Sequence, residues 1–317
     1  MELTRTTVHS FLDFWTGLLG IIACTLVIFL SITRVKNRAL QVYSIMMVTT
    51  ASVELAQAIT TVATFTTGCF GNKIVFMLVD NPWYPKQQSM TYFAVGLQLF
   101  LMFLSVSMLP LQFVYRYGVM RGKPFTKVQL LGMFFISVCF AGLHGGLTPF
   151  TFLPASPKYD IALREALDAP PDQPLPGYLV GDVHEFNVMA AHFGNVLVIM
   201  ASSYAVIIIM IILSKNTVTL KSTDSVSKQT QAVQRQVTQI IYLQALYPVI
   251  FVCLPCLLFP IYAVQGKAAP YVAEWAVYSM HTPPLINSLA VIMCVPSYRH
   301  FVSKPFRSEK VVSTSNS

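Results

Sequence analysis

Residues 186–213 read FNVMAAHFGNVLVIMASSYAVIIIMIIL, an apolar run without a Lys, Arg, Asp or Glu side chain. A helix needs about 20 mainly apolar residues to cross a bilayer, so this run predicts one membrane span. Six other apolar segments of similar length lie before and after it in the chain. The seven predicted spans are residues 9–33, 40–66, 90–115, 128–152, 186–213, 237–264 and 272–296.

The composition of the chain supports this interpretation. Of its 317 residues, 55% are hydrophobic and only 11% are charged, whereas about 25% of the residues of an ordinary soluble domain are charged. Such a chain is too apolar for a soluble enzyme, a disordered chain or a fibrous protein. The long apolar runs do not alternate, which excludes a transmembrane β-barrel. The predicted fold class is an all-α integral membrane protein, a seven-transmembrane helix bundle.

The Lys and Arg residues predict the orientation of the bundle. If the N-terminus lies outside, most of the 21 basic residues fall in the tail and in the three loops on the inner side. The positive-inside rule therefore predicts an outer N-terminus and a cytoplasmic C-terminus. Residues 1–301 form the predicted transmembrane domain, and residues 302–317 form a short cytoplasmic tail. We expect the basic residues to face the lipid bilayer, and no nucleic-acid partner is needed to explain them.

Two segments outside the spans are predicted to be loops. Residues 153–185 are rich in Pro and in acidic residues, which favours a mostly irregular extracellular loop. A lid over a ligand entrance is the alternative interpretation of this segment. The run Ile74–Val79 is too short to span a membrane and is predicted to be part of a loop.

Polar side chains recur at helical spacing in four of the spans. Because a strongly polar side chain is costly in hydrocarbon, we expect these four faces to converge on the bundle interior. The residues are Thr50, Glu54, Gln57, Thr61 and Thr64 in the second span, Gln98, Ser105 and Gln112 in the third, His184, Asn187, Ala191 and Asn195 in the fifth, and Glu274, Tyr278 and His281 in the seventh.

These polar residues have two interpretations. For Glu54, Gln112 and Asn195, at mid-membrane depth, hydrogen bonding between helices is favoured. The residues in the outer halves are the candidate ligand contacts: Gln98, His184, Asn187, Glu274, Tyr278 and His281. Glu274 and His281 also have the spacing to pair with each other. His144 is predicted to be a packed or interfacial histidine, and Asp13 to be wetted by lipid headgroups.

Signals of catalysis are missing from the sequence. It contains no HExxH, GxSxG or Walker motif. No predicted span contains a lysine for a retinal Schiff base, since Lys267 falls in the last outer loop. The six cysteines do not follow a zinc-binding pattern. We therefore predict no enzymatic activity, no cofactor and no metal site.

Prolines are expected to bend the last two spans. Pro248, Pro255 and Pro260 lie in the sixth span, and Pro283–Pro284 lie in the seventh. Each proline removes a backbone hydrogen bond from its helix. The bends have two interpretations. They are a fixed feature of how the helices pack, or they give the bundle two packing arrangements of similar energy, between which a ligand selects.

Four short motifs carry a resemblance to a known family. Tyr43-Ser44 begins the second span, Val114-Tyr115-Arg116-Tyr117 ends the third, Gln244–Pro248 (QALYP) lies in the sixth, and Pro296–Phe301 (PSYRHF) follows the seventh. With seven spans and a proline-kinked sixth span, the chain resembles the nematode serpentine chemoreceptors, which are seven-transmembrane G protein-coupled receptors. It is most similar to class delta (Srd), with the Str and Srh classes as near relatives.

The resemblance implies a function in sensory perception such as olfaction. The expected partners are a small-molecule chemical cue and a heterotrimeric G protein, and the expected location is the plasma membrane of a sensory cilium. By resemblance, Arg116 takes the place of the arginine that many receptors use at the G-protein face. The candidate G-protein contacts are Tyr115, Arg116, Arg121, Arg235 and Arg299, and topology and lipid contact alone are the alternative interpretation of the basic ones. The acid that precedes the arginine in many receptors is replaced by Tyr115. The usual disulfide between the third span and the second outer loop cannot form, because neither segment has a cysteine.

Other classes of function remain open at this stage. A small-solute transporter or ligand-gated channel predicts a solute flux that depends on Glu54 or Glu274 and not on Arg116. A scaffold of the ciliary membrane predicts that substitutions in the pocket change no response. A homo- or hetero-dimer is compatible with the sequence.

Overall fold

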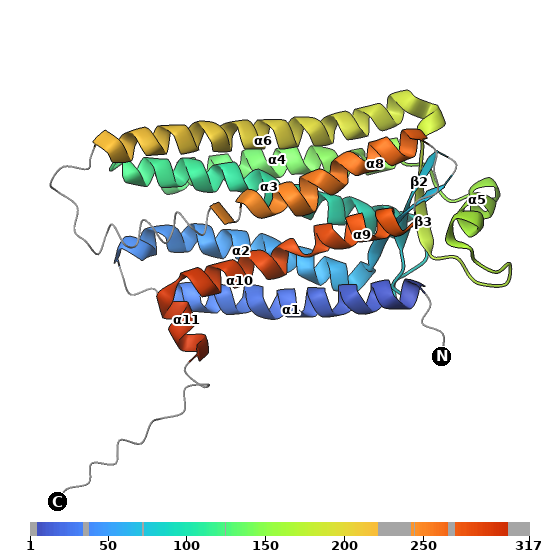
Figure 1. Ribbon diagram of the computed structural model, residues 1–317, viewed down its shortest axis with the longest axis horizontal. Helices are drawn as coiled ribbons and strands as arrows, with labels where there is room; N and C mark the ends of the chain where they lie inside the picture. Colours follow the sequence, from blue (N-terminus) through green and yellow to red (C-terminus); the bar gives the residue numbers. More distant parts are fainter. Residues whose placement is uncertain are drawn as a thin grey trace, which may run out of the picture.

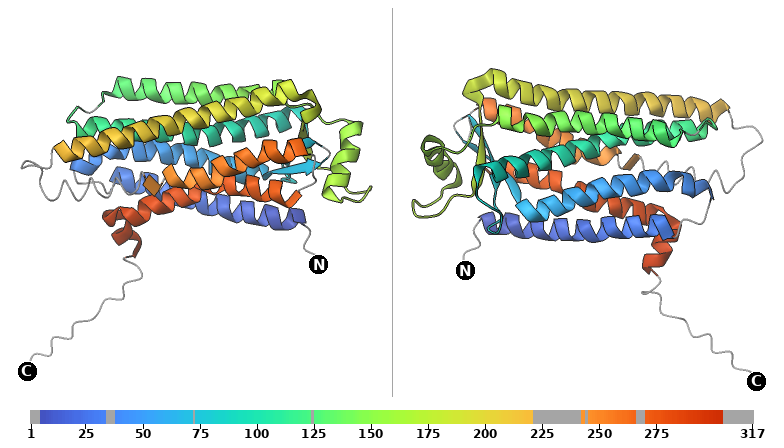
Figure 2. Two further views of the ribbon diagram at one scale, coloured as in Figure 1. Left: turned by 45° about the horizontal axis from the view of Figure 1, so that its top comes forward. Right: turned by 180° about the vertical axis from the view of Figure 1, so that it is seen from behind.

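The computed structural model describes residues 5–33, 38–71, 73–123, 125–220, 242–243, 245–265 and 270–303. These residues form an elongated helix bundle that carries a small β-sheet and a short helix at one end (Figure 1, Figure 2). We call this end the sheet end. The opposite end, at which helix α3 ends and helix α11 lies, is the α11 end (Figure 1).

Five helices in the described part of the chain are long and apolar enough to cross a membrane. They are α1 (Arg5–Thr33), α2 (Arg38–Thr64), α3 (Gln88–Met120), α4 (Lys127–Thr151) and α6 (Phe186–Leu220). Helix α3 continues to Met120, beyond the predicted end at residue 115. A capping box of Thr126 and Gln129 defines the start of α4, because each side chain bonds the other's backbone N–H.

The last two spans are broken into shorter pieces. In the sixth, a π-helix, η2 (Val249–Cys253), follows Pro248 and leads into α8 (Leu254–Gln265). In the seventh, α9 (Pro270–His281) and α10 (Pro283–Cys294) are separated at Thr282, and α11 (Pro296–Ser303) follows. These breaks match the bends predicted from the prolines, since proline cannot continue the hydrogen-bond ladder of a helix.

A three-stranded antiparallel sheet lies at the sheet end, in the order β1 (Thr66–Gly71), β2 (Ile74–Val79) and β3 (Gly177–Asp182). Phe76 in β2 pairs with Cys69 in β1 and with Val180 in β3. The prediction of a loop at residues 74–79 is therefore wrong. This run is apolar, partly β-branched and fully buried, and it has the length of a typical strand.

The prediction that residues 153–185 are mostly irregular is also wrong. They contain helix α5 (Pro157–Leu167), strand β3 and a short 3₁₀ helix, η1 (Val183–Glu185). Pro157 occupies the first turn of α5, where a missing N–H costs nothing. Leu163 of α5 is fully buried against side chains of the sheet. The composition did not reveal this order because β3 is formed by pairing with β2, which is distant in sequence.

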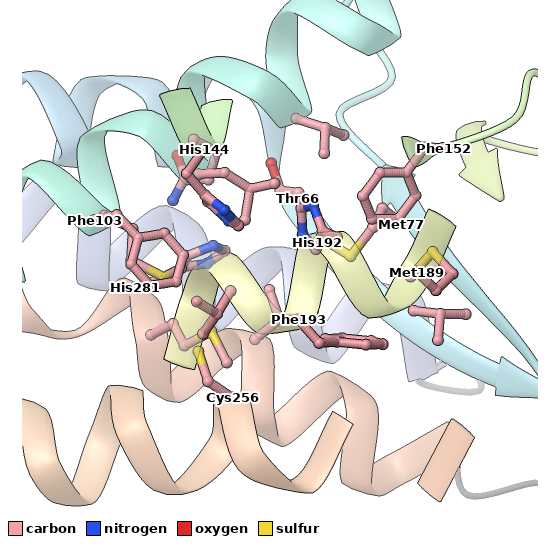
Figure 3. A pocket seen from close by; sticks show the side chains of 18 residues that line it. Thr66, Met77, Phe103, His144, Phe152, Met189, His192, Phe193, Cys256 and His281 are labelled. Carbon is pink, nitrogen blue, oxygen red and sulfur yellow. The ribbon is translucent and has the colours of Figure 1, made fainter. Parts of the chain in front are cut away.

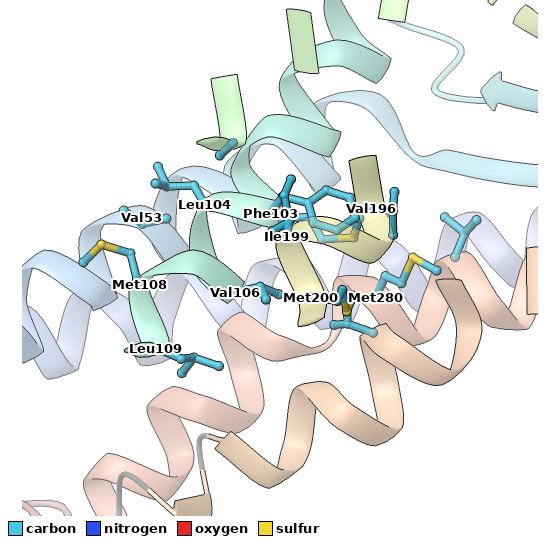
Figure 4. Close-up of a cluster of buried hydrophobic side chains, with 14 of the residues drawn as sticks. Val53, Phe103, Leu104, Val106, Met108, Leu109, Val196, Ile199, Met200 and Met280 are labelled. Atoms are coloured by element: carbon cyan, nitrogen blue, oxygen red, sulfur yellow. The ribbon is translucent and has the colours of Figure 1, made fainter. Parts of the chain in front are cut away.

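Helix α3 lies at the centre of the bundle and packs against α2, α4 and α6. Figure 4 shows part of this core, where Phe103 of α3 lies beside Val196 and Ile199 of α6. The outward face of α4 is apolar and exposed, as Leu131 and Phe135 illustrate. Such a face suits contact with lipid tails.

Polar side chains link the helices inside the bundle. The Asn287 amide of α10 donates a 2.7 Å hydrogen bond to the Glu54 carboxylate of α2. The Gln112 amide of α3 donates a 3.0 Å hydrogen bond to the Thr50 hydroxyl of α2. Hydrogen bonding between helices, predicted for Glu54 and Gln112, is thus confirmed.

The predicted polar face of the fifth span is wrong. His184 in η1 and Ala191 in α6 are exposed, whereas His192 and Val196 are buried. The buried face of α6 is therefore rotated from the predicted one by about one residue, or roughly 100°.

Candidate functional site

An internal cavity lies just below the sheet, inside the bundle (Figure 3). It is bounded by β1, β2, α3, α4, α6, α8 and α9. The cavity volume, counted over the positions that the centre of a water molecule can occupy, is about 70 Å³, and one buried water needs roughly 10–15 Å³ on this measure. The space therefore suits a compact organic molecule of about five to seven non-hydrogen atoms.

The lining of the cavity is mainly apolar. Its apolar side chains are Val75, Met77, Val95, Leu99, Met102, Phe103, Phe152, Met189, Phe193, Val196, Cys256, Val277 and Met280. The polar ones are Thr66, Gln98, His144, His192 and His281. No Lys, Arg, Asp or Glu of the described part of the chain lines the cavity. A pocket of this kind suits an apolar ligand that carries few hydrogen-bonding groups.

His281 connects the cavity to a buried carboxylate on α1. It is the last residue of α9, and its Nδ1 lies 2.9 Å from Oδ1 of Asp13. Nδ1 of His9 lies 3.2 Å from the other carboxylate oxygen of Asp13. The contact with Asp13 occupies Nδ1 and fixes the ring orientation of His281. Nε2 is therefore the ring nitrogen that can form a hydrogen bond with a molecule in the cavity.

Two further histidines form one wall of the cavity. The rings of His144 and His192 are stacked at a tilt, with centroids 4.4 Å apart. Phe103 contacts His144 edge-on at 4.3 Å, and Nδ1 of His192 lies 3.3 Å from the Thr151 hydroxyl. Figure 3 shows the two imidazoles side by side. The stack holds both rings in fixed orientations.

A close approach of α3 and α4 places His144 in this wall. Gly145 faces Gly96, and a Cβ on Gly145 would lie only 2.7 Å from the Gly96 carbonyl oxygen and 2.8 Å from Cβ of Phe100. Only a residue without a side chain allows the two backbones to come so close. The neighbouring His144 is therefore fully buried between α3 and α6.

The structure brings two of the six candidate ligand residues to the cavity wall. Gln98 and His281 line it, and the Gln98 amide also donates a 3.2 Å hydrogen bond to the Thr61 hydroxyl. His184 is exposed in η1. Asn187 lies in the first turn of α6, and its side chain is outside the described part of the structure.

The remaining two, Glu274 and Tyr278, lie on α9 outside the cavity lining. Glu274 is buried. The Tyr278 hydroxyl is 3.0 Å from the Thr16 hydroxyl of α1. Tyr278 therefore belongs to the contact between α9 and α1.

Two interpretations of polar residues at the sheet end need correction. Asp13 is fully buried and not wetted by headgroups, because α9 and α1 enclose it between His281 and His9. His281 pairs with Asp13 and not with Glu274. Nearby, the pKa of Asp80, in the loop after β2, is raised to about 6, mainly by burial and also by the negative charges of Glu274 and Asp13.

The contribution of His192 was not predicted from the sequence, and His144 was expected to be only a packed or interfacial histidine. Both lie in apolar runs, where a single histidine does not stand out. A buried stripe of His192, Val196 and Ile199 at helical spacing was the available signal in α6. The contact between His144 and His192 joins two helices that are distant in sequence, so no local pattern reveals it.

The α11 end contains four of the five candidate G-protein contacts. Arg116 is buried and hydrogen-bonded to the Tyr242 side chain, while the Tyr115 ring packs edge-on against Tyr43. Arg121, next to the Tyr117 ring, and Arg299 in α11 are exposed. Arg235 lies outside the described residues.

The described residues contain no group of three or more His, Cys, Asp or Glu side chains that could hold a metal ion.

Comparison with known proteins identifies the fold and the family of the chain. No curated protein matches it. The crystal structure of squid rhodopsin is similar in fold, with a TM-score of 0.59 and 11% sequence identity over 96% of this chain and 87% of that one. At this identity the likeness establishes only the seven-transmembrane fold. Residues 10–304 match the family model of the serpentine type seven-transmembrane GPCR chemoreceptor Srd, and the chain therefore belongs to this family of multi-pass membrane receptors.

Proposed function

We propose that this protein is a chemosensory G protein-coupled receptor that binds an extracellular small molecule in the cavity and activates a heterotrimeric G protein at the α11 end. The family is one of receptors and not of enzymes. The observation that carries the proposal is the mainly apolar cavity between α3, α4, α6, α8 and α9. Its place of action is the plasma membrane of a sensory cell, at the cilium, with the sheet end outside.

The cavity contacts both of the broken spans. Cys256 lies in α8 just after the π-helix η2, and His281 ends α9 just before the break at Thr282. A bound molecule therefore touches the two spans in which the helix geometry is interrupted. If it contacts one arrangement of these spans better than the other, it shifts the population toward that arrangement.

At the α11 end, a hydrogen bond between the third and sixth spans would respond to such a population shift. Arg116 of α3 is hydrogen-bonded to Tyr242, which precedes η2 in the sixth span. This bond takes the place of the contact with an adjacent acid that Tyr115 rules out. Movement of the sixth span would release Arg116, which together with Tyr115, Arg121, Arg235 and Arg299 forms the proposed G-protein surface.

The proposal is tested by blocking the cavity from within. Cells that express the receptor with a G-protein reporter are screened with a panel of small volatile and water-soluble compounds. Val196→Phe fills the cavity, whereas Val198→Phe, on the same helix, places the same ring on the exposed outer face. We expect Val196→Phe to abolish the response and Val198→Phe to retain it, at equal surface expression.

A third variant separates binding from coupling. Arg116→Ala is expected to abolish G-protein activation while the purified receptor still binds the active compound. A solute current or uptake that persists in Arg116→Ala, without G-protein activation in the wild type, would overturn the proposal in favour of a transporter or channel.

A further inference from the structure

We propose that the cavity selects uncharged molecules in which a hydroxyl or carbonyl group is attached to a small apolar body, and that His144 and Gln98 hold the polar group. This inference rests on the proposed function, because it names the chemical class of the cue.

The first observation is a set of buried polar atoms without partners. Among the described residues, neither ring nitrogen of His144 has a hydrogen-bond partner, although the side chain is fully buried. The Oε1 atom of Gln98 is also without a partner, and the relative exposure of Gln98 is only 5%. Buried polar groups in proteins nearly always form hydrogen bonds, and leaving them unpaired is unfavourable. Both side chains line the cavity, so a bound molecule can satisfy them.

The second observation concerns charge. No carboxylate or basic side chain among the described residues lines the cavity, apart from the three imidazoles. A charge on His281 is balanced by Asp13 at 2.9 Å. His144 packs against His192 and the Phe103 ring, so a proton added there would place a charge in apolar surroundings beside a second histidine. A charged ligand would have no partner of opposite charge, which is costly inside a bundle.

These observations define the group that is recognised. A neutral imidazole offers one N–H donor and one acceptor, and Oε1 of Gln98 offers an acceptor. A hydroxyl can complement both kinds of atom, and a carbonyl can accept from the imidazole N–H. The apolar remainder of the lining then takes the apolar body of a molecule that has about five to seven non-hydrogen atoms in total.

The test uses five small cyclic probes with the same number of non-hydrogen atoms. Purified full-length receptor in nanodiscs is unfolded by heat in increasing concentrations of cyclohexanol, cyclohexanone, methylcyclohexane, cyclobutanecarboxylate or cyclohexylamine. We expect cyclohexanol and cyclohexanone to stabilise the receptor at concentrations about tenfold below those of methylcyclohexane. The two charged probes are expected to have no effect that depends on the cavity.

Variants separate binding in the cavity from effects on the lipid. His144→Phe keeps an aromatic ring in the wall but removes both nitrogens, and Gln98→Leu removes the amide. Each is expected to abolish the preference for the alcohol and ketone over the hydrocarbon. His144→Gln restores a donor and an acceptor and should recover part of it. His300→Phe, the same exchange in exposed α11, is the matched control and should behave like the wild type.

Several outcomes would overturn the inference. They are equal effects of methylcyclohexane and cyclohexanol, a stronger effect of a charged probe, a preference that survives in both His144→Phe and Gln98→Leu, or no stabilisation by any probe. Because binding is measured without a G protein, the two proposals fail separately. A cue that activates the receptor and is blocked by Val196→Phe, with all five probes inactive, overturns only this inference. The expected probe pattern together with no G-protein activation by cyclohexanol or cyclohexanone overturns only the proposed function.

Discussion

The burial of a polar residue at the sheet end can depend on a partner that is far away in the chain. Asp13 lies between His9 on its own helix and His281 on α9. The polar face of the second span could be predicted, since Glu54 and Gln57 repeat at helical spacing and are indeed buried. The burial of Asp13 could not, because the residue lies near a predicted span end and its partner is supplied by another helix.

Asp80 provides a test of this environment through pH. Its carboxyl group releases a proton at an ordinary pKa of 3.8 in an unfolded chain, and burial raises the pKa to about 6 in the folded protein. The folded state therefore binds more protons between these values, so the stability contributed by Asp80 falls as pH rises through this window. Asp80→Asn removes the ionised form, and we expect it to stabilise the receptor at pH 7.5 by on the order of 1–2 kcal/mol.

The stabilising effect of Asp80→Asn should shrink toward pH 4.5, where the wild-type carboxyl group is protonated too. Thermal unfolding of the purified receptor across this pH range measures the difference. Asp172→Asn, in an exposed loop, serves as the control and should change little at any pH. A gain that stays constant with pH would contradict the assignment.

At the scale of elements, the pairing of α3 with α4 positions the histidine wall. The apolar runs were sufficient to predict the long helices, since a span of hydrocarbon requires a continuous run of apolar residues. The strands could not be predicted in the same way. β3 is ordered by its register with β2, in which Phe76 pairs with Val180 across about 100 intervening residues, and sequence periodicity reports only local structure.

The contact between α3 and α4 can be tested with two adjacent glycines. Gly145→Ala places a methyl group 2.7 Å from the Gly96 carbonyl oxygen, so the helices must separate. We expect a loss of about 1–3 kcal/mol of stability, measured by thermal unfolding. A Cβ on Gly146 meets no atom within 4 Å. Gly146→Ala should therefore be neutral or slightly stabilising, and an equal loss in both variants would argue against close packing at Gly145.

At the scale of the whole molecule, hydropathy was sufficient for the seven-transmembrane class, which the family match confirms. The helix that supplies a given wall of the cavity was less predictable. The apolar fifth span has few polar residues to mark its buried side, and the predicted face was wrong for this reason. The orientation in the membrane stays a prediction of the basic residues.

Engineered glycosylation sites at the two ends test this orientation. Asp172→Asn with Pro174→Thr creates an Asn-x-Thr site near the sheet end, and Arg121→Asn with Lys123→Thr creates one after α3. Because glycans are added only on the lumenal side of the membrane, we expect the first variant to be modified and the second to remain unmodified. Gel mobility before and after glycosidase treatment reads the result, and the reverse pattern would overturn the proposed orientation.

The sheet and helix α5 form a cap at the sheet end, and the bonds that hold this cap in place have a practical consequence. All six thiols are free, and the segment after α4 is held by the pairing of β2 with β3 and by the bond from the Tyr159 hydroxyl to Asp182. Backbone hydrogen bonds form without an oxidant and are unaffected by thiol reagents. The receptor can therefore be synthesised in a reducing cell-free system and purified in millimolar dithiothreitol with this cap in place. The reductant then protects the thiol of Cys256, beside the cavity, from oxidation.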